Sequence, residues 1–479
     1  MAMGHDPPDA TPSAGAPAPP GASGSQSAPH PPGRTDPVAL LRSRGYVALL
    51  AAAAVLGVPV AAAAYGFLVL VGYLQEELFT HLPHELGFAT APAWWPLPVL
   101  VIGGVLTGLA IRYLPGGGGP SPAGGFAMHP PPTPVQLPGV LLAALATLAF
   151  GAVLGPEMPL IALGGGLGLL ATKAARRRPV PERGVRVLGV SGSFAAISTL
   201  LGSPITGAFL LMEASGLGGP TLDLVLLPGL LASGVGALIF IGLGELTGHG
   251  TFALAITNLP PFDRPTLGEF GWAIVIGLAA ALIGPAIHRL GLFLHGYATR
   301  WTMIVVPLAG AAVAVLTIIY TEATGKPASN VLFSGEEDMG TLVHAAASYS
   351  VGALLLLLVC KSLAYAVCLS SFRGGPVFPA LFIGTTGGIA LSHLPGLPLV
   401  AGVAMGLGAM TVVMLKLPLT SVLLPSILLA SEAVPLMPLV IVAVVVAHVA
   451  SAHLTPSPAA KPRGGEPAGR GAHADAAQA

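Results

Sequence analysis

Charged residues are scarce in this sequence. Only 8% of its 479 residues are Asp, Glu, Lys or Arg, whereas 53% are hydrophobic and the mean hydropathy is +0.81. An average soluble domain carries roughly 25% charged residues, so the composition excludes an ordinary soluble enzyme or binding module. The formal net charge is +0, which gives no indication of a nucleic-acid or acidic protein partner.

Cysteine is nearly absent as well. The two cysteines, Cys360 and Cys368, lie eight residues apart in one apolar segment. Along a helix this separation is too large for them to form a disulfide with each other. We therefore expect reduced core residues, with no metal site and no cofactor.

Apolar runs follow one another from Tyr46 to Leu454. A helix needs about 20 apolar residues to cross a bilayer, so ten or more membrane helices fit into this length. We predict an all-α, multi-pass protein of the cell (plasma) membrane. Arg42 and Arg44 precede the first run, which by the positive-inside tendency places the N-terminus in the cytoplasm. Residues 1–45 and 455–479 are rich in Pro, Ala and Gly, and we predict that both are disordered.

Several of the apolar segments are too short to cross the membrane. The short ones begin at glycine and proline, in GPEMP (155–159), GSPITG (202–207), GGPVFP (374–379) and KLPLTS (416–421). Proline costs little in the first turn of a helix, so these stretches predict helix starts within the membrane. The unpaired N–H groups at a helix start favour an anion. The predicted segments are 46–74, 94–113, 135–153, 158–172, 185–201, 204–214, 222–246, 268–296, 301–321, 341–370, 377–391, 397–415, 417–431 and 434–453.

The short segments form an internal repeat. GPEMPLIALGG (155–165) and GPVFPALFIGT (375–385) share Gly-Pro-x-x-Pro at an offset of 220, and SPITG (203–207) matches LPLTS (417–421) at an offset of 214. Repeated halves with interrupted helices indicate a transporter with its site near the midplane. We predict a first membrane repeat over 46–246, a second over 247–454, and a site where their Gly-Pro-x-x-Pro motifs meet.

The two copies differ at one position, where the first has Glu157 and the second has Val377. A carboxylate in lipid costs at least about 2.5 to 3.5 kcal/mol, so such a residue is normally functional or satisfied by partners. We interpret Glu157 as functional, with a buried, satisfied carboxylate as the alternative.

At these residues the chain resembles the CLC family of chloride channels and proton/chloride exchangers. GPEMPLIALGG aligns with the Gly-Arg/Lys-Glu-Gly-Pro motif of that family, SSFRGGPVFPALFIGTTGG (370–388) with its Gly-x-Phe-x-Pro motif, and GSFAAISTLLGSPITGAFLLMEA (192–214) with the segment between them. The resemblance implies an inverted repeat of tilted and partly re-entrant helices, in a homodimer with one pore per subunit. It implies transport of chloride or a similar small anion, as a channel or a proton/anion antiporter.

The resemblance also implies roles for individual residues. Glu157 matches the gating glutamate, whose carboxylate competes with the anion for one site and is released by protonation. The matching anion-binding positions are Gly155, Pro156, Met158, Gly375, Val377 and Phe378.

Four features of the chain depart from the family pattern. Pro376 has no N–H to donate to an anion. The Gly-Ser-Gly-Ile-Pro loop corresponds to GGGGPSPAGG (116–125), where an ungapped alignment puts Pro120 on the serine and a shift of one puts Ser121 there. We prefer Ser121 as the anion-binding residue because its hydroxyl donates, and a hydroxyl that only stabilises the turn is the equal alternative. The family has a tyrosine beyond its last helix that closes the inner side of the pore, and the residues after His453 contain no counterpart of it. The inner proton-relay glutamate falls on Ala214, with Glu213 beside it.

Glu213 has two interpretations. It is a substitute on the proton path, or it ends its helix in water; since a helix turns about 100° per residue, it faces away from the family position.

An intramembrane serine protease is a different class of function to consider. GVSG (189–192) fits the Gly-x-Ser-Gly of rhomboid-like proteases, with Ser191 as nucleophile and His448 or His453 as base. Small residues at this spacing more often pack helices closely. We therefore predict a transporter and not an enzyme.

Overall fold

The computed structural model describes residues 41–174, 181–216, 220–248 and 255–454. The regular secondary structure of the described residues is helical. Besides the helices, these residues form one isolated β-bridge, between Gly155 and Gly375. The tails predicted to be disordered lie outside the described residues, apart from 41–45, where the first described long helix begins at Arg44.

Seven helical segments of the described residues are long and apolar enough to cross a membrane. They are α2 with its continuation α3 (Arg44–Glu76 and Leu82–Glu85), α4 (Pro96–Tyr113), α9 (Pro220–Thr247), α10 (Leu267–Arg300), α11 (Thr302–Thr324), α13 (Val351–Ser371) and α17 (Ala433–Leu454). The others are α5 (Leu137–Leu148), α6 (Glu157–Ala174), α7 (Glu182–Leu200), α8 (Pro204–Ser215), α12 (Asp338–His344), α14 (Val377–Ser392), α15 (Leu399–Leu415) and α16 (Pro418–Leu428).

The four helix starts predicted from glycine and proline are confirmed. Helices α6, α8, α14 and α16 begin at Glu157, Pro204, Val377 and Pro418. At α8 the Ser203 hydroxyl accepts a bond from the Thr206 amide, N–O 3.3 Å, which completes an N-cap.

The prediction of one apolar segment over 341–370 is wrong. The chain forms the short helix α12, passes through a turn at Ala346–Ser348, and starts α13 at Val351. The Ser350 hydroxyl caps this new start by accepting a bond from the Ala353 amide, N–O 3.2 Å. Ser350 therefore marks the start of α13, six residues after α12 has ended at His344.

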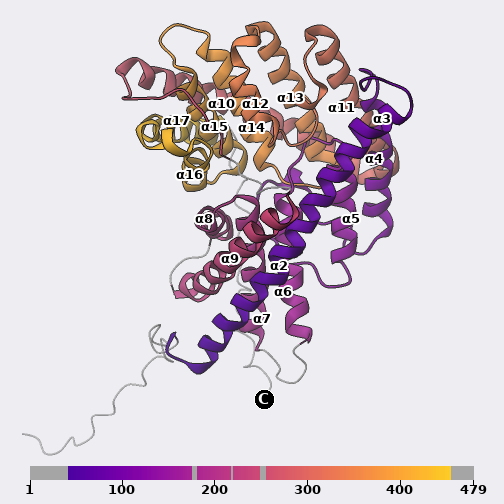
Figure 1. The fold of residues 1–479 in the computed structure, drawn as a ribbon, viewed down its shortest axis with the longest axis vertical. Coiled ribbons are helices and arrows are strands. Elements are labelled where there is room, and N and C mark those ends of the chain that lie inside the picture. Colours follow the sequence, from indigo (N-terminus) through magenta and orange to yellow (C-terminus); the bar gives the residue numbers. More distant parts are fainter. Residues whose placement is uncertain (1–40, 175–180, 217–219, 249–254, 455–479) are drawn as a thin grey trace, which may run out of the picture. The chain divides into compact units, whose positions relative to one another are not determined.

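Two helix pairs pack closely through glycine, and they are related by the offsets of the sequence repeat. In α6 and α7, a Cβ added at Gly164 would lie 2.1 Å from the carbonyl oxygen of Gly192. In α14 and α15, a Cβ added at Gly384 would lie 2.2 Å from the carbonyl oxygen of Gly406. Small residues let membrane helices approach to main-chain contact. Both pairs can be followed in Figure 1.

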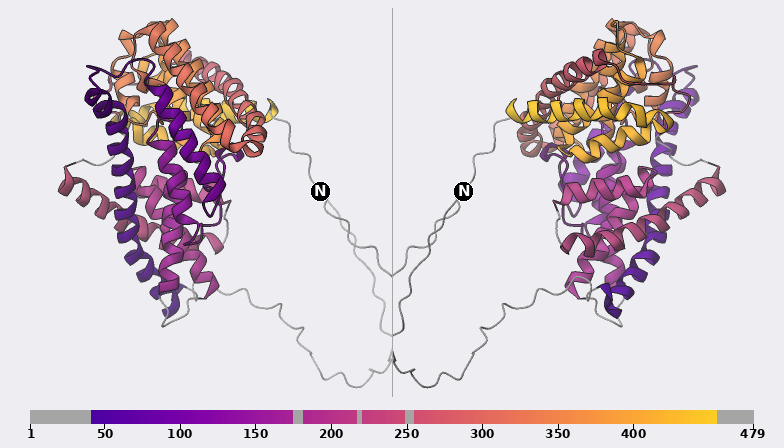
Figure 2. Two further views of the ribbon diagram at one scale, coloured as in Figure 1. Left: turned by 90° about the vertical axis from the view of Figure 1, so that its right-hand side faces the viewer. Right: turned by 90° about the vertical axis from the view of Figure 1, so that its left-hand side faces the viewer.

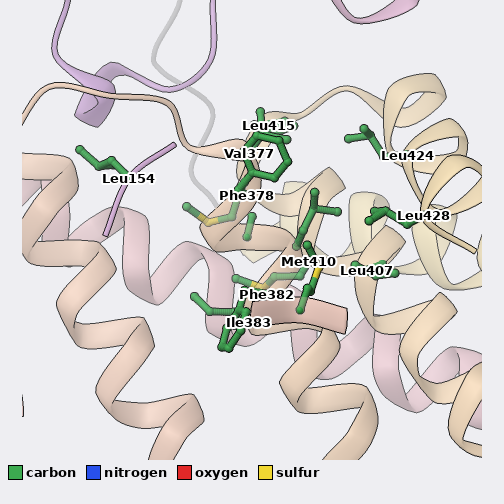
Figure 3. Packing of buried hydrophobic residues seen from close by; sticks show 14 of the residues in the cluster. Leu154, Val377, Phe378, Phe382, Ile383, Leu407, Met410, Leu415, Leu424 and Leu428 are labelled. Carbon is green, nitrogen blue, oxygen red and sulfur yellow. The ribbon is translucent and has the colours of Figure 1, made fainter. Parts of the chain in front are cut away.

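The apolar core is continuous around these pairs. Figure 3 shows side chains of α14, among them Phe378 and Phe382, packed beside side chains of α15, among them Met410. Helices α13 to α17 lie together, as the orange and yellow ribbons of Figure 2 show. In the first half, α2 runs along α7 and α9. This packing fixes the starts of α6 and α14, where the candidate site lies.

Candidate functional site

The two Gly-Pro-x-x-Pro motifs meet in the structure. The Gly155 amide donates to the Gly375 carbonyl with an N–O distance of 2.8 Å, and the Gly375 amide donates to the Gly155 carbonyl with an N–O distance of 2.6 Å. Beside them, Leu154 packs against Gly374, whose added Cβ would lie 2.7 Å from the Leu154 Cβ. The bridge brings the first turns of α6 and α14 to one place, although they are 220 residues apart in the chain.

The Glu157 carboxylate reaches across this junction. Glu157 is the first residue of α6 and is 0% exposed. Its Oε1 accepts a hydrogen bond from the Phe378 amide, N–O 2.9 Å. The amides of Val377 and of Glu157 itself also interact with the carboxylate. A carboxylate of one copy of the repeat thus lies on the exposed N–H groups of the other, where the positive end of a helix dipole favours an anion.

The other carboxylate oxygen, Oε2, is buried without a hydrogen-bond partner. It lies against the two bridging glycines. A Cβ added at Gly375 would lie 1.6 Å from Oε2, and one added at Gly155 would lie 2.3 Å from it. Any larger residue at either position would fill the space that the carboxylate occupies, so the seat of Glu157 depends on both glycines.

Pro376 has an unexpected partner. The Tyr365 hydroxyl, on α13, donates to the Pro376 carbonyl with an O–O distance of 2.8 Å, and both groups are buried. A tyrosine therefore holds the start of α14, although it comes from a different part of the chain than the tyrosine of the family pattern. Sequence reasoning missed it because a tyrosine in an apolar segment resembles an ordinary core residue.

Met158, the second residue of α6, lines a cavity of about 180 Å³. The cavity lies between the glycine- and proline-rich loop, represented by Gly119 and Pro120, and helices α6 and α7, represented by Ile161 and Ser193. It joins the start of α6 to the loop in which Ser121 was predicted to bind an anion.

The structure places Ser121 in polar surroundings of a different kind. Its hydroxyl accepts from the Ala123 amide at an N–O distance of 3.4 Å and lies 3.4 Å from Nδ1 of His295 on α10. Only the three-residue turn Pro122–Gly124 follows, so this loop does not supply a helix dipole. No hydrogen bond joins Ser121 to the residues of the Gly155–Gly375 bridge within the described chain.

Glu213 caps another helix. Its Oε1 accepts from the Leu419 amide, N–O 2.9 Å, and its Oε2 accepts from the Thr420 amide and hydroxyl, at 2.8 and 2.7 Å. The end of α8 therefore satisfies the start of α16, its partner in the repeat. Two main-chain N–H groups and one hydroxyl at this helix start thus donate to one carboxylate.

Lys361 is a second intramembrane charge, and sequence reasoning missed it. It is 0% exposed on α13, and its ammonium donates to the carbonyls of Leu332 and Phe333 with N–O distances of 2.8 and 3.1 Å. It also lies 4.6 Å from the centroid of the Phe382 ring. The rule that a charge in an apolar segment is functional or structurally essential applies to Lys361 as it does to Glu157.

Lys361 fixes the loop that carries Glu336. In this loop, the Phe333 amide donates to the Gly151 carbonyl, N–O 3.2 Å, and Gly335 packs against the Phe382 ring. Glu336 follows directly and is half-buried. Burial raises the pKa of Glu336 well above its usual value, and the charges of Glu157 and Glu337 raise it further. A second carboxyl group thus lies within electrostatic reach of Glu157.

The remaining predicted residues pack in the core. Cys360 and Cys368 are buried free thiols, and the Cys368 sulfur accepts from the Val153 amide at 3.2 Å. The Ser191 hydroxyl donates to the Val187 carbonyl of its own helix, O–O 2.8 Å, as a packing serine does. The described residues contain no group of three His, Cys, Asp or Glu side chains that could hold a metal ion.

Comparisons with known proteins agree with this geometry. A family model described as "Voltage gated chloride channel" matches residues 103–452. The Escherichia coli (strain K12 / DH10B) protein YfeO, named for ion transport, is 30% identical over 336 residues, which cover 69% of this chain and 75% of YfeO. The protein YfeO of strain O6:H1 (CFT073 / ATCC 700928 / UPEC) is 31% identical over the same length.

Two solved structures share the fold. A slow cyanobacterial Cl−/H+ antiporter aligns with a TM-score of 0.67 at 20% identity, over 85% of this chain and 94% of that chain. A CLC-type fluoride/proton antiporter aligns with a TM-score of 0.58 at 19% identity, over 84% of this chain and 95% of that chain. The predicted all-α fold of the CLC type is therefore confirmed. The chain is a multi-pass membrane protein that transports small inorganic anions, and it belongs to the voltage-gated chloride channel, or CLC, family.

Proposed function

We propose that Glu157 gates the passage of chloride or a similar small anion through this protein. The bond from the Phe378 amide to the Glu157 carboxylate, N–O 2.9 Å, carries the proposal. A carboxylate and a halide are both anions, and the N–H groups at the start of α14 stabilise either of them. With the carboxylate seated, the anion is excluded; with the carboxylate displaced, the same amides bind the anion.

Protonation of Glu157 releases its side chain from the amides of α14. A protonated Glu157 is neutral, so it loses the charge-assisted bond to the Phe378 amide and the attraction of the α14 dipole. The unpartnered Oε2 offers a position for the proton without breaking another hydrogen bond. Occupancy of the pore then depends on proton concentration, as a gated channel or a proton/anion antiporter requires.

The backbone around the carboxylate forms the anion site. We propose that Gly155, Pro156 and Met158 at the start of α6, and Gly375, Val377 and Phe378 at the start of α14, surround the anion. Their main-chain dipoles hold an anion without a full positive charge, which lets it leave. Ser121 is a further ligand in this proposal; it directly follows Pro120, which lines the same cavity as Met158. For Glu213 we propose the capping role and not a place on the proton path, because its three hydrogen bonds all go to the start of α16.

We propose that the protein acts as a homodimer in the cell membrane, with its N-terminus in the cytoplasm and no catalytic activity. Apolar side chains on α8 and α16 support an apolar partner surface, because Ile205 and Leu419 are 62% and 55% exposed. The basic residues before the first span support the orientation.

Vesicles test the transport activity. Purified protein is reconstituted with a chloride gradient, and proton movement is followed with the membrane potential clamped. Uphill proton movement driven by chloride identifies an antiporter, whereas chloride flux without proton movement identifies a channel. Absence of anion flux from vesicles with folded protein would contradict the proposal.

A further inference from the structure

Arg373 is a half-buried cation next to the proposed anion site. It lies two residues before Gly375, so its α-carbon is within about 7.6 Å of the glycine against which the Glu157 carboxylate packs. Its amide donates to the Thr147 hydroxyl on α5, N–O 3.2 Å, which ties the loop before α14 to the first half of the chain. A permanently charged group is therefore fixed close to the junction of the two repeats.

The guanidinium of Arg373 is short of partners. One of its terminal nitrogens donates to the Phe372 carbonyl, N–O 3.1 Å, whereas Nε is buried without a hydrogen-bond partner. The ion pairs of the described residues both involve His81, and no carboxylate among these residues pairs with Arg373. A guanidinium carries five donors and stays protonated. A half-buried charge without a counter-ion, one of whose donors is buried and unsatisfied, attracts an anion from outside the chain.

The glycine loop at residues 116–119 lets the Arg373 side chain approach its main chain closely. Gly116, Gly117, Gly118 and Gly119 all have positive φ, which other residues adopt only with strain. A Cβ added at Gly118 would lie 3.3 Å from the Arg373 Cγ and 3.0 Å from the Ala143 Cβ. The arginine stem therefore lies against the loop that leads to Ser121.

Two main-chain groups that could stabilise an anion are missing near Arg373. Pro376 has no N–H, and the turn after Ser121 is only three residues long, so it contributes no helix dipole. An anion on this side of the junction finds less help from main-chain groups than it finds at Phe378. A formal positive charge at Arg373 makes up this deficit.

We propose that the Arg373 guanidinium binds a small monovalent inorganic anion, at a position separate from the seat of the Glu157 carboxylate. The inference rests on the proposed anion pathway and adds a charged ligand to it. Because the guanidinium fork bonds planar oxyanions at two points, the position favours nitrate over chloride. A full charge also holds the anion more tightly than amides do, which slows its release.

Anion-dependent stability tests this proposal. The melting temperature of the purified full chain is measured while sodium chloride replaces sodium gluconate at constant ionic strength, because an anion that binds the folded state raises it by mass action. Arg373→Gln is expected to raise the chloride concentration at half-effect about tenfold or more, since it removes a charge-assisted bond. Arg112→Gln, at an exposed arginine of α4, is the matched control and is expected to leave the half-effect concentration unchanged.

A second variant keeps the test decisive when Arg373→Gln does not fold. Arg373→Lys retains the charge but loses the fork, so it is expected to keep chloride-dependent stabilisation and to lose the preference for nitrate. An unchanged half-effect concentration in Arg373→Gln, or an unchanged nitrate to chloride ratio in Arg373→Lys, would overturn the proposal. Failure of the Glu157 gate is seen separately, as an unaltered flux in Glu157→Gln, and does not affect these readouts.

Discussion

Gly155 and Gly375, which occupy the same place in the two copies of the repeat, exchange both of their main-chain hydrogen bonds, with N–O distances of 2.8 and 2.6 Å. This bridge places the start of one re-entrant helix against the start of the other. Because only the first copy carries a carboxylate, Glu157 reaches the amides of the second copy and no reciprocal contact forms from Val377. One bridge therefore positions one carboxylate.

Gly375→Ala is expected to unseat the Glu157 carboxylate. The added Cβ would lie 1.6 Å from Oε2 and 2.6 Å from Cδ of Glu157. Loss of a hydrogen bond to a charged group corresponds to about a tenfold or larger fall in occupancy of the seat. Anion flux in vesicles should rise, and its dependence on pH should weaken. Gly387→Ala on the same helix, where the nearest atom is 4.0 Å away, is the control. If Gly375→Ala folds and keeps the anion flux and pH dependence of the parent, Gly375 is not needed to position the Glu157 carboxylate, and the prediction is wrong.

Lys361→Met is expected to destabilise the loop that carries Glu336. The carbonyls of Leu332 and Phe333 lose their donor, and a buried acceptor without a donor costs about 1–3 kcal/mol. The melting temperature should fall, and amide exchange should rise over residues 331–336. Lys173→Met, at an exposed position, should change neither quantity. Equal exchange in Lys361→Met and the parent would show that the lysine does not hold this loop.

Glu336 predicts a pH dependence of stability. Its pKa is raised by burial and by the charges of Glu157 and Glu337, so the folded protein binds a proton that the unfolded chain releases near the usual value of 4.5. The associated stability is complete below pH 4.5 and is lost as the pH rises above that value toward the raised pKa. The melting temperature of Glu336→Gln should therefore fall less with rising pH than that of the parent. Parallel curves would contradict the prediction.

Glu213→Gln separates capping from proton transfer. The variant keeps one acceptor oxygen where the start of α16 uses two, so we expect a loss of about 0.5–2 kcal/mol of stability. The ratio of protons to anions moved should stay at the parent's value, because all three bonds of the carboxylate serve helix α16. Glu245→Gln, at an exposed position, is the control. A changed ratio at unchanged stability would instead place Glu213 on the proton path.

The starts of the short helices could be predicted from the sequence because their signals are local. Proline in the first turn marks α8 and α16, and the repeated Gly-Pro-x-x-Pro marks α6 and α14. Glu157 could be found for a related reason: a charge in an apolar run is costly wherever the chain places it. The break before α13 was missed because its polar signal is short, Ser348 to Ser350, and lies within a long run that is mostly apolar.

The partners of these residues could not be predicted, because they lie far away in the chain. Lys361 bonds to carbonyls 28 and 29 residues before it, and Tyr365 holds the carbonyl of Pro376 in a loop beyond its own helix. Arg373 lies in the quoted motif SSFRGGP, yet its missing counter-ion becomes visible only when the surrounding carboxylates are located in space. Spacing in a sequence identifies a helix start, whereas the free donors and acceptors around it follow from tertiary packing.

The most direct test of the central claim is proton movement and anion flux in vesicles that contain Glu157→Gln. Glutamine has nearly the shape of glutamic acid but has no charge to seat or release. We predict that anion flux changes and no longer depends on pH, and that any proton movement coupled to chloride is abolished. Anion flux and proton coupling equal to those of the parent would contradict the role of Glu157 as the gate.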